Sequence, residues 1–405
     1  MTTRVATNTA YRNSVYYMQH RNAELTKASD QYNTGKKFQT AADSPADYAA
    51  TMRLEHDIAM YDQYTTNSGY AYDSLSLEET ALGTINTVLD RANVLLQSGV
   101  NGRNSGSDLT AISQELKEIQ KQIKDLINTK TATGESIFSG SLSDKDAYVF
   151  DNGKYVCQAD NGQRSVQASA SAQIAVSDSA KNFFEQVATA RTIEVPDDIS
   201  FTYNDYQTFE SFYNRNYKCN TDDAEEKLNN SYTITKEGEQ YVIKDHEDNE
   251  ISRSSDNATS INFNGLTFDV SNLAGTATFN LAPHKNDNIL NTLGEAIQTI
   301  EDYNNGRKTI AEVNNTLAQT QVSVKNTQFS VNTVMTKIGA RHNTLDNIMT
   351  ANTDISAVKQ EAKATISEVD LFEATTNLTK NQSYLQMAMS SFHYVTGTSL
   401  FDYIR

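Results

Sequence analysis

The sequence predicts a mainly α-helical protein with an inserted β-rich domain, in which long helices from both ends of the chain pack as an antiparallel bundle. Near both ends of the 405-residue chain, apolar residues recur every seven positions, which is the spacing of a helix-packing seam. Only three prolines, Pro45, Pro196 and Pro283, are present to interrupt helices. Between about residues 139 and 283, short alternating runs typical of strands replace the seven-residue repeat.

Each terminal segment carries one narrow apolar seam. In the first segment the seam residues are Tyr11, Val15, Met18, Leu25 and Tyr32. In the last segment they are Leu371, Ala374, Leu378, Leu385, Ala388, Phe392 and Val395. A seam of this width does not stabilise an isolated helix of this length, so each segment is expected to need a partner helix.

The inner flanks repeat the pattern more strongly. A helix predicted over about residues 46–98, with a bend near Asn67–Gly69, has a leucine at every seventh position: Leu75, Leu82, Leu89 and Leu96. After a turn at 98–107, the next helix carries Leu109, Ile112, Leu116, Ile119, Ile123 and Leu126. Towards the other end, a matching seam contains Val324, Val331, Val334, Ile338, Leu345, Ile348 and Ile355, and is interrupted by Arg341 and Asn352. These stretches favour an antiparallel bundle over the alternative of an ordinary compact helical domain, because sustained seams are uncommon in short globular helices.

The middle of the chain reads as short strands joined by turns. The predicted strands are Ala147–Phe150, Ser231–Thr235, Gln240–Lys244, Ile261–Phe263, Leu266–Val270 and Thr276–Leu281. Asn264-Gly265, between two apolar residues, is a strong signal for a two-residue hairpin turn. A short helix is expected around residues 180–191. The sequence therefore predicts a β-rich domain inserted into a helical one.

These patterns divide the chain into four parts. We expect an N-terminal arm and loop over residues 1–45 and a helical rod built from residues 46–140 and 285–365. An outer β-rich domain is expected over residues 141–284, and a C-terminal arm over residues 366–405.

The charge balance argues against nucleic-acid and membrane partners. The chain has 34 Lys and Arg residues against 51 Asp and Glu, a net charge of −17, whereas nucleic acids and anionic membranes bind basic surfaces. No run of 18 or more apolar residues is present, so no membrane-spanning helix is expected. The first ten residues lack the apolar core of a secretory signal, which by itself favours a cytoplasmic location.

The residues do not indicate an enzyme. The six histidines are scattered without metal-ligand spacing, and no phosphate loop, dinucleotide fingerprint or nucleophile elbow is present. The acidic clusters at 222–226 and 245–250 lack the pattern of a calcium loop. We therefore expect no catalytic residues, no cofactor and no metal. Cys157 and Cys219 fit no metal or redox motif, and both a disulfide between them and two separate thiols are possible.

Three stretches carry a family resemblance. Residues 32–46 read Tyr-Asn-Thr-Gly-Lys-Lys-Phe-Gln-Thr-Ala-Ala-Asp-Ser-Pro-Ala and resemble the loop after the first helix in the flagellin superfamily. Residues 132–140 resemble that family's exit from its helical domain, and residues 398–404 resemble the ending of its hook-associated protein 3 branch. The matching loop positions are Thr34, Gly35, Lys36, Asp43 and Pro45. Pro45 is typical of the same branch, whereas Asn33 and Ser44 depart from the pattern.

The resemblance, which covers about residues 1–140 and 285–405, implies a structural subunit of the bacterial flagellum that joins the hook to the filament as a ring of head-to-tail subunits. It implies that both terminal arms are disordered in the free monomer and pair as a coiled coil on assembly. The implied partners are other hook-associated and flagellin subunits, further copies of the chain, and an export chaperone at the C-terminal arm. The implied location is extracellular, after export without a cleaved signal peptide.

Two alternatives remain open. The chain resembles filament flagellins as well, so a minor or major flagellin is the second reading. A flagellin-like protein with an enzymatic or adhesive insert is the third, although no group of residues in the insert supports it.

Overall fold

The computed structural model describes residues 2–100, 104–196, 198–218, 230–273, 275–283 and 285–397, with side chains from residue 8 to residue 394. The chain forms two compact units. The first comprises Met1–Ser68, Ala168–Ser171 and Asp346–Arg405, and the second comprises Gly69–Gln167 and Ala172–Leu345. Among the described residues, no helix combines the length and the hydropathy needed to cross a membrane.

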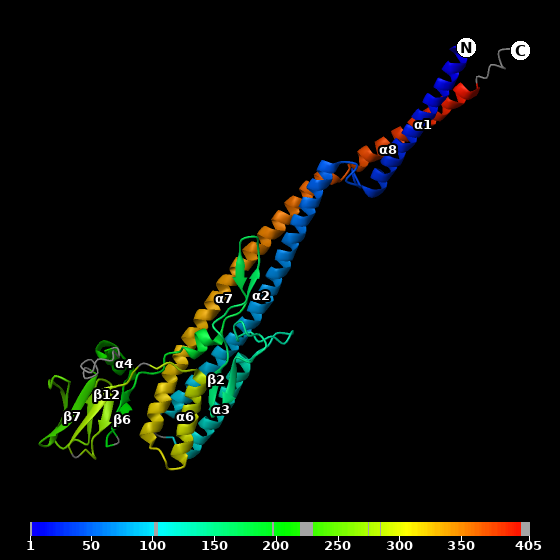
Figure 1. Ribbon diagram of the computed structural model, residues 1–405. Helices are drawn as coiled ribbons and strands as arrows, with labels where there is room; N and C mark the ends of the chain where they lie inside the picture. The colour runs from blue at the N-terminus through cyan, green and yellow to red at the C-terminus, as the bar shows by residue number, and fades with distance from the viewer. Residues whose placement is uncertain are drawn as a thin grey trace. The chain divides into compact units, whose positions relative to one another are not determined.

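The first unit contains both ends of the chain. Helix α1 (Thr2–Thr34) lies along helix α8 (Leu371–Gly397), as Figure 1 shows. The beginning of α2 (Pro45–Gly99) lies along the end of α7 (Ile310–Ser367). Three contacts between them are Asp57–Lys359 at 2.6 Å, Glu55–Lys363 at 2.9 Å and Ser356 Oγ to Asp62 Oδ1 at 3.2 Å. Residue numbers rise on one helix as they fall on the other, so the pairing is antiparallel.

The second unit is built on a helical bundle. It contains the later part of α2, helix α3 (Gly106–Ile127), helix α6 (Ile289–Asn304) and the earlier part of α7. Most of the predicted seam residues are in the core, because the following side chains have no exposed surface: Leu75, Leu82, Leu89, Leu96, Leu109, Leu116, Ile123, Val324, Val331, Ile338 and Leu345. Two seam residues do not fit: Leu126 is half-buried while its neighbour Ile127 is buried, and Ile355, in the first unit, is 39% exposed. The predicted bundle is confirmed, and it is held together mainly by apolar burial along these seams.

The helices differ from the prediction in two places. The bend expected at Asn67–Gly69 does not break α2, which is helical throughout, although the boundary between the two units falls at Ser68 and Gly69. The second difference is a break between α6 and α7 that we did not predict. There the chain reads Asn304-Asn305-Gly306, and Gly306 has a φ of 72°, the left-handed conformation that commonly ends a helix.

The middle of the chain forms antiparallel strands. Two hairpins come first: β1 (Tyr148–Asp151) with β2 (Lys154–Cys157), and β3 (Ser165–Gln167) with β4 (Gln173–Ala175). One sheet has the strand order β10-β11-β6 and another the order β5-β12-β7-β8-β9. Their strands are β5 (Ile193–Glu194), β6 (Ser200–Tyr203), β7 (Ser231–Glu237), β8 (Gln240–Lys244), β9 (Glu250–Arg253), β10 (Ser260–Phe263), β11 (Leu266–Asp269) and β12 (Thr276–Leu281).

The inserted domain is built around an aromatic core. The two sheets and helix α4 (Tyr206–Asn216) bury one cluster that includes Phe209, Tyr213, Tyr232, Ile243, Phe263, Phe268 and Phe279. The predicted hairpin at Asn264-Gly265 is confirmed, because both residues have positive φ, 43° and 84°, as the turn requires. The two earlier hairpins lie outside this cluster; β1–β2 binds α6, where the Tyr155 amide donates to Asn291 Oδ1 at 2.8 Å.

The helix that we predicted around residues 180–191 is shorter in the structure. The structure has one π-helical turn, η1 (Lys181–Glu185), which places Phe183 and Phe184 in the core. We did not predict helix α4, although Asp205 provides a signal for it. The Asp205 carboxylate accepts hydrogen bonds from the amides of Gln207 (3.0 Å) and Thr208 (3.3 Å), which caps the helix.

The polar interruptions of the α7 seam bind the segment before η1. In the second unit, Arg341 forms a two-point ion pair with Asp178 at 2.6 and 3.0 Å. In the first unit, Asn352, which is 2% exposed, donates to the carbonyl of Ala168 at 2.8 Å. Arg341 and Asn352 therefore each provide a hydrogen-bond partner for a polar group of the segment that packs onto α7.

Glu78 of α2 is a buried carboxyl beside this ion pair. It is 1% exposed, and its Oε1 accepts the Asp178 amide at 3.1 Å, while its Oε2 has no partner among the described residues. Burial raises the pKa of Glu78 well above its usual value, and the nearby Asp178 raises it further, whereas Arg341 opposes the shift. A carboxyl with a raised pKa stabilises the fold below its unfolded pKa and loses that contribution as the pH rises through the folded pKa.

We expect Glu78→Gln to stabilise the second unit at pH 7.5 by about 1–3 kcal/mol, the scale of an uncompensated buried polar group. The advantage should shrink as the pH falls and wild-type Glu78 takes up a proton. Thermal unfolding at a series of pH values measures this. Glu79→Gln is the matched control, because the Glu79 side chain is 49% exposed and should change little. Equal effects of the two variants would contradict the claim that burial of the Glu78 carboxylate destabilises the second unit.

Candidate assembly interface

The pairing of α1 with α8 brings the two predicted terminal seams together. The ring of Tyr11 lies 5.5 Å from the ring of Phe392, between centroids, and Arg21 lies 5.0 Å from the ring centroid of Tyr384. From the first contact to the second, residue numbers rise on α1 and fall on α8, so the pair is antiparallel. It is held by a narrow line of apolar contacts and one cation–π contact.

The pair covers its seams only in part. Leu385 is 9% exposed, and Val15, Met18, Leu25, Leu378 and Phe392 are half-buried. Tyr11 and Tyr32 are 47% and 41% exposed. Leu371 is 63% exposed because it is the first residue of α8 and no preceding helical turn covers it. The side chain of Val395 lies outside the described residues.

Sequence reasoning missed three members of this contact. Ala28 is 4% exposed, and Arg21 and Tyr384 form the cation–π contact. An apolar heptad search passes over an arginine, and it gives a small alanine little weight. The signal that was available is the spacing of Arg21 and Ala28, which continues the three-and-four pattern of Met18 and Leu25.

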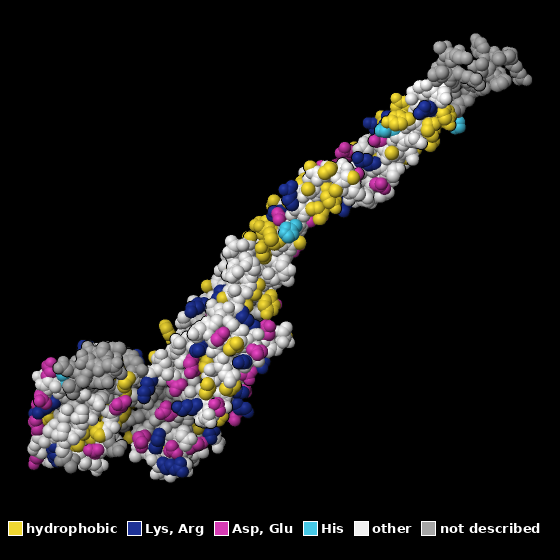
Figure 2. All heavy atoms as spheres, viewed as in Figure 1, with side chains coloured by type: hydrophobic (Ala, Val, Ile, Leu, Met, Phe, Trp, Pro, Cys, Tyr) yellow, Lys and Arg dark blue, Asp and Glu magenta, His cyan; other side chains and the backbone are white. Residues whose placement is uncertain are grey.

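Large apolar side chains remain exposed on the outside of the same pair. The exposed large apolar side chains of α1 and α8 include Tyr16, Tyr17, Leu371, Phe372, Met387, Met389 and Tyr394. Figure 2 shows apolar groups on the face of the pair that it presents. Phe372 is 82% exposed and Tyr394 is 77% exposed. Apolar side chains gathered in this way, and tyrosine in particular, are typical of surfaces that bind other proteins.

The loop between α1 and α2 has a defined structure. Gly35 ends α1 with a φ of 66°, and its amide donates to the carbonyl of Gln31 at 2.9 Å. The Asp43 carboxylate accepts the amides of Thr40 (3.0 Å) and Gln39 (3.2 Å) and the Thr40 hydroxyl (2.9 Å). These bonds, first that from the Thr40 amide, lower the pKa of Asp43. The loop therefore closes on its own carboxylate.

The remaining motif residues form the ends of this loop. The Thr34 hydroxyl donates to the Asp30 carbonyl at 2.6 Å, and Pro45 is the first residue of α2, where its missing amide hydrogen costs nothing. Lys36 faces Glu368 in an isolated antiparallel bridge. On either side of the bridge, the Lys37 amide donates to Ser367 (2.8 Å) and the Val369 amide donates to Gly35 (2.9 Å). The loop is thus bound to the connection between α7 and α8.

The structure shows no arrangement for catalysis by metal ions in the part of the chain that it describes. No group of three or more His, Cys, Asp or Glu side chains is placed there to hold a metal. Cys157 is a half-buried free thiol in β2, and burial raises its pKa, which makes it less reactive. Cys219 lies outside the described residues.

The comparisons with known proteins agree with this geometry. The family model for the bacterial flagellin N-terminal helical region matches residues 5–143. Residues 5–143 are thus similar to the N-terminal helical region of bacterial flagellins. The match spans α1, the Gly35–Asp43 loop, α2 and α3. Each of these helices packs against a helix from the later part of the chain: α1 against α8, α2 against α7, and α3 against α6.

Two relatives of this chain are flagellar hook-associated proteins. Flagellar hook-associated protein 3 of Escherichia coli K12 is 26% identical over 194 residues, which cover 48% of this chain and 60% of that protein. Flagellar hook-associated protein 3 of Salmonella typhimurium LT2 is 27% identical over 206 residues, which cover 46% of this chain and 65% of that protein. The chain thus aligns with somewhat less than two thirds of the length of these relatives.

A solved structure supports the fold independently. The crystal structure of hook-associated protein 3 from Legionella pneumophila superposes with a TM-score of 0.59 and 22% sequence identity, and covers 78% of this chain and 99% of that one. At this identity the likeness establishes the flagellin-type fold.

Gly35 provides a test of the loop. We expect Gly35→Ala to destabilise the first unit by roughly 1 kcal/mol, because a left-handed conformation is unfavourable for any residue with a Cβ. No other atom lies within 4 Å of the new methyl group, so strain alone is tested. Gly69→Ala is the control: Gly69 is helical and equally uncrowded, and this change should stabilise by up to about 1 kcal/mol. Thermal unfolding should show shifts of opposite sign.

Proposed function

We propose that this chain is a structural subunit of the bacterial flagellum that joins the hook to the filament. The observation that carries the proposal is the α1–α8 pair, which combines a flagellin-type N-terminal helix with a seam that the pair leaves partly exposed. The similarity to two hook-associated proteins 3 favours the junction over the body of the filament. Its role is structural and not enzymatic.

The proposed mechanism is assembly by completion of the terminal pair. Only Ala28, Ala374 and Leu385 of the described residues in α1 and α8 are less than one-tenth exposed, so little apolar surface stabilises this pair in the free chain. Neighbouring subunits would cover Tyr11, Leu371 and the exposed aromatic side chains. The terminal arms are therefore ordered by the same contacts that join the subunits, which couples folding to binding.

The partners follow from this mechanism. Further copies of the chain would form a ring through head-to-tail contacts, with hook-type subunits on one side and flagellin subunits on the other. Before assembly, an export chaperone would cover the C-terminal arm, where Leu378 and Leu385 would otherwise associate prematurely. The subunit would be exported without a cleaved signal peptide and act outside the cell, with the acidic β domain facing the solvent.

Labelling of the chain in its source bacterium tests the function. We expect immuno-electron microscopy to show one band at the distal end of each hook. Label along the whole filament would instead identify a filament flagellin, and absence of label from the flagellum would overturn the proposal.

Leu385→Asp tests the mechanism. Because Leu385 is the most buried large side chain of the terminal pair, a charge there should abolish incorporation into flagella while the second unit stays folded. Leu378→Asp should have the same effect, less completely. Incorporation can be measured by immunoblotting of isolated flagella, and thermal unfolding reports the second unit. Loss of the second unit's unfolding transition in these variants would contradict the account.

The insert provides a further check. The Ala282 amide donates to the carbonyl of Thr192 at 3.0 Å, so the two ends of the β domain lie side by side. Replacement of residues 193–281 by a short Gly-Ser linker should therefore leave the bundle folded and the chain competent for incorporation. Failure of the bundle to fold would show that the insert is part of its core.

A further inference from the structure

Helix α7 carries an exposed aromatic side chain on the second unit. Phe329 is 76% exposed, and Lys325 and Lys337, four residues before it and eight after it, are exposed on the same face. The helix is fixed at this point, because the Ser330 hydroxyl donates to the Phe183 carbonyl at 2.6 Å and Asn326 donates to the Ala188 carbonyl at 2.8 Å. Phe329 is therefore an apolar projection on a rigid support, flanked by positive charge.

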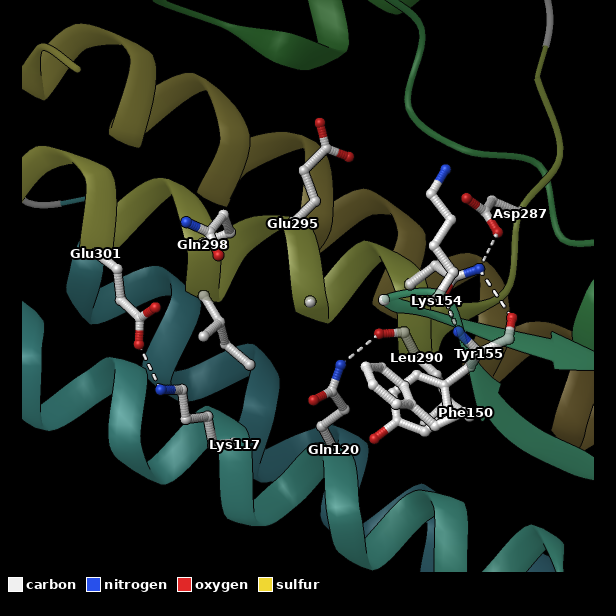
Figure 3. Close-up of a pocket in the computed structure, with 14 residues that line it drawn as sticks. Lys117, Gln120, Phe150, Lys154, Tyr155, Asp287, Leu290, Glu295, Gln298 and Glu301 are labelled. Carbon is white, nitrogen blue, oxygen red and sulfur yellow. Dashed lines mark hydrogen bonds and ion pairs between the residues drawn. The ribbon is translucent and has the colours of Figure 1, made fainter. Parts of the chain in front are cut away.

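A groove of about 690 Å³ opens elsewhere on the same unit, between α3, α6 and the β1–β2 hairpin. The rings of Phe150 and Tyr155 stand together in it, 5.0 Å apart between centroids, as Figure 3 shows. Gly294 of α6 also lines it, and a Cβ at this position would lie 3.1 Å from Gln120 Nε2. Phe150 is 64% exposed, so its ring offers apolar surface to another molecule.

The groove is preformed and its rim is acidic. Gln120 donates to the Leu290 carbonyl at 2.7 Å, which ties α3 to α6 along the groove (Figure 3). Three carboxylates and two lysines line it: Asp287, Glu295, Glu301, Lys117 and Lys154. Lys117 is neutralised by its ion pair with Glu301, whereas the exposed Glu295 forms no ion pair with any described residue. Glu295 is thus available to a positive charge from outside.

We propose that the groove binds Phe329 of a second copy of this chain, with Glu295 facing Lys325 or Lys337 of that copy. Charge favours this occupant: the exposed Lys325 and Lys337 flank Phe329, outnumber the one carboxylate that lines its cleft, Glu210, and match the carboxylate of Glu295 in the groove. Phe329 lines a different cleft from the groove, and the two share no lining residue. One unit therefore presents both an apolar projection and a groove, which is a heterologous contact that joins copies in a ring or helix.

This inference rests on the proposed assembly of copies in a flagellum, and names the contact between their bundles. Buried aromatic residues at the centre of an interface commonly dominate its affinity, and Phe329 has the required size and rigidity. Its removal should leave the stability of the free chain unchanged, because the side chain is 76% exposed and makes little contact within the unit.

Photo-crosslinking tests the contact in assembled flagella. Benzoyl-phenylalanine is placed at position 329 in the full chain, and a mixture of ¹⁵N-labelled and unlabelled copies identifies links between molecules. We expect links from position 329 to peptides that contain residues 150–155 or 290–298 of a second copy. The same crosslinker at Val94, which is 54% exposed on α2, should not reach these peptides. Links only within one copy, to another region or to a different protein would overturn the inference.

A charge exchange provides an independent readout. Phe329→Ala should lower incorporation into flagella roughly tenfold or more, the effect of losing a central aromatic contact. Glu295→Lys should also lower it, and the double change Lys325→Glu, Lys337→Glu in the same chain should restore it. Normal incorporation of both Phe329→Ala and Glu295→Lys would contradict the contact. Absence of the unmodified chain from flagella would instead refute the proposed function, so the two failures are distinguishable.

Discussion

The narrowness of the apolar seams is the constraint on which the rest of this structure depends. A seam that repeats every seven residues occupies one strip of a helix, and it is stable only when a second helix covers that strip. In the second unit, α2, α3, α6 and α7 cover one another completely, and residues such as Leu82 and Val331 have no exposed surface. In the first unit, α1 and α8 cover one another only in part. The same seven-residue repeat thus forms a fully buried seam in the second unit and a partly exposed seam in the first.

The polar groups of the bundle follow from the same constraint. In a long seam of similar apolar residues, polar residues fix how the two helices align along their axes. Both polar interruptions in α7 bind residues of the segment before η1. Asp178 links Arg341 to Glu78, because its carboxylate pairs with the Arg341 guanidinium and its amide donates to the Glu78 carboxyl. An arrangement of this kind specifies where the segment packs, but it adds little net stability, because burying its charges costs free energy.

Periodicity was sufficient to predict most of the helical architecture, and it failed where structure depends on single residues. Heptads extend over many turns, so the long helices and their buried faces could be read directly. Helix α4 rests on one capping aspartate, and the break after Asn304 rests on one glycine with positive φ, so neither leaves a periodic signal. In the terminal pair, the heptad residues were recognisable, but their degree of exposure was not. Leu371 and Tyr32 fit the repeat as well as Leu385 does, and only the packing separates them.

We propose that the terminal pair is incomplete until other subunits cover it. Amide hydrogen exchange of the free chain and of isolated flagella compares the two states directly. We expect amides of residues 8–34 and 371–394 to exchange rapidly in the free chain and to become protected in flagella, while those of the bundle helices are protected in both. Strong protection of the terminal segments in the free chain, equal to that of the bundle, would contradict it.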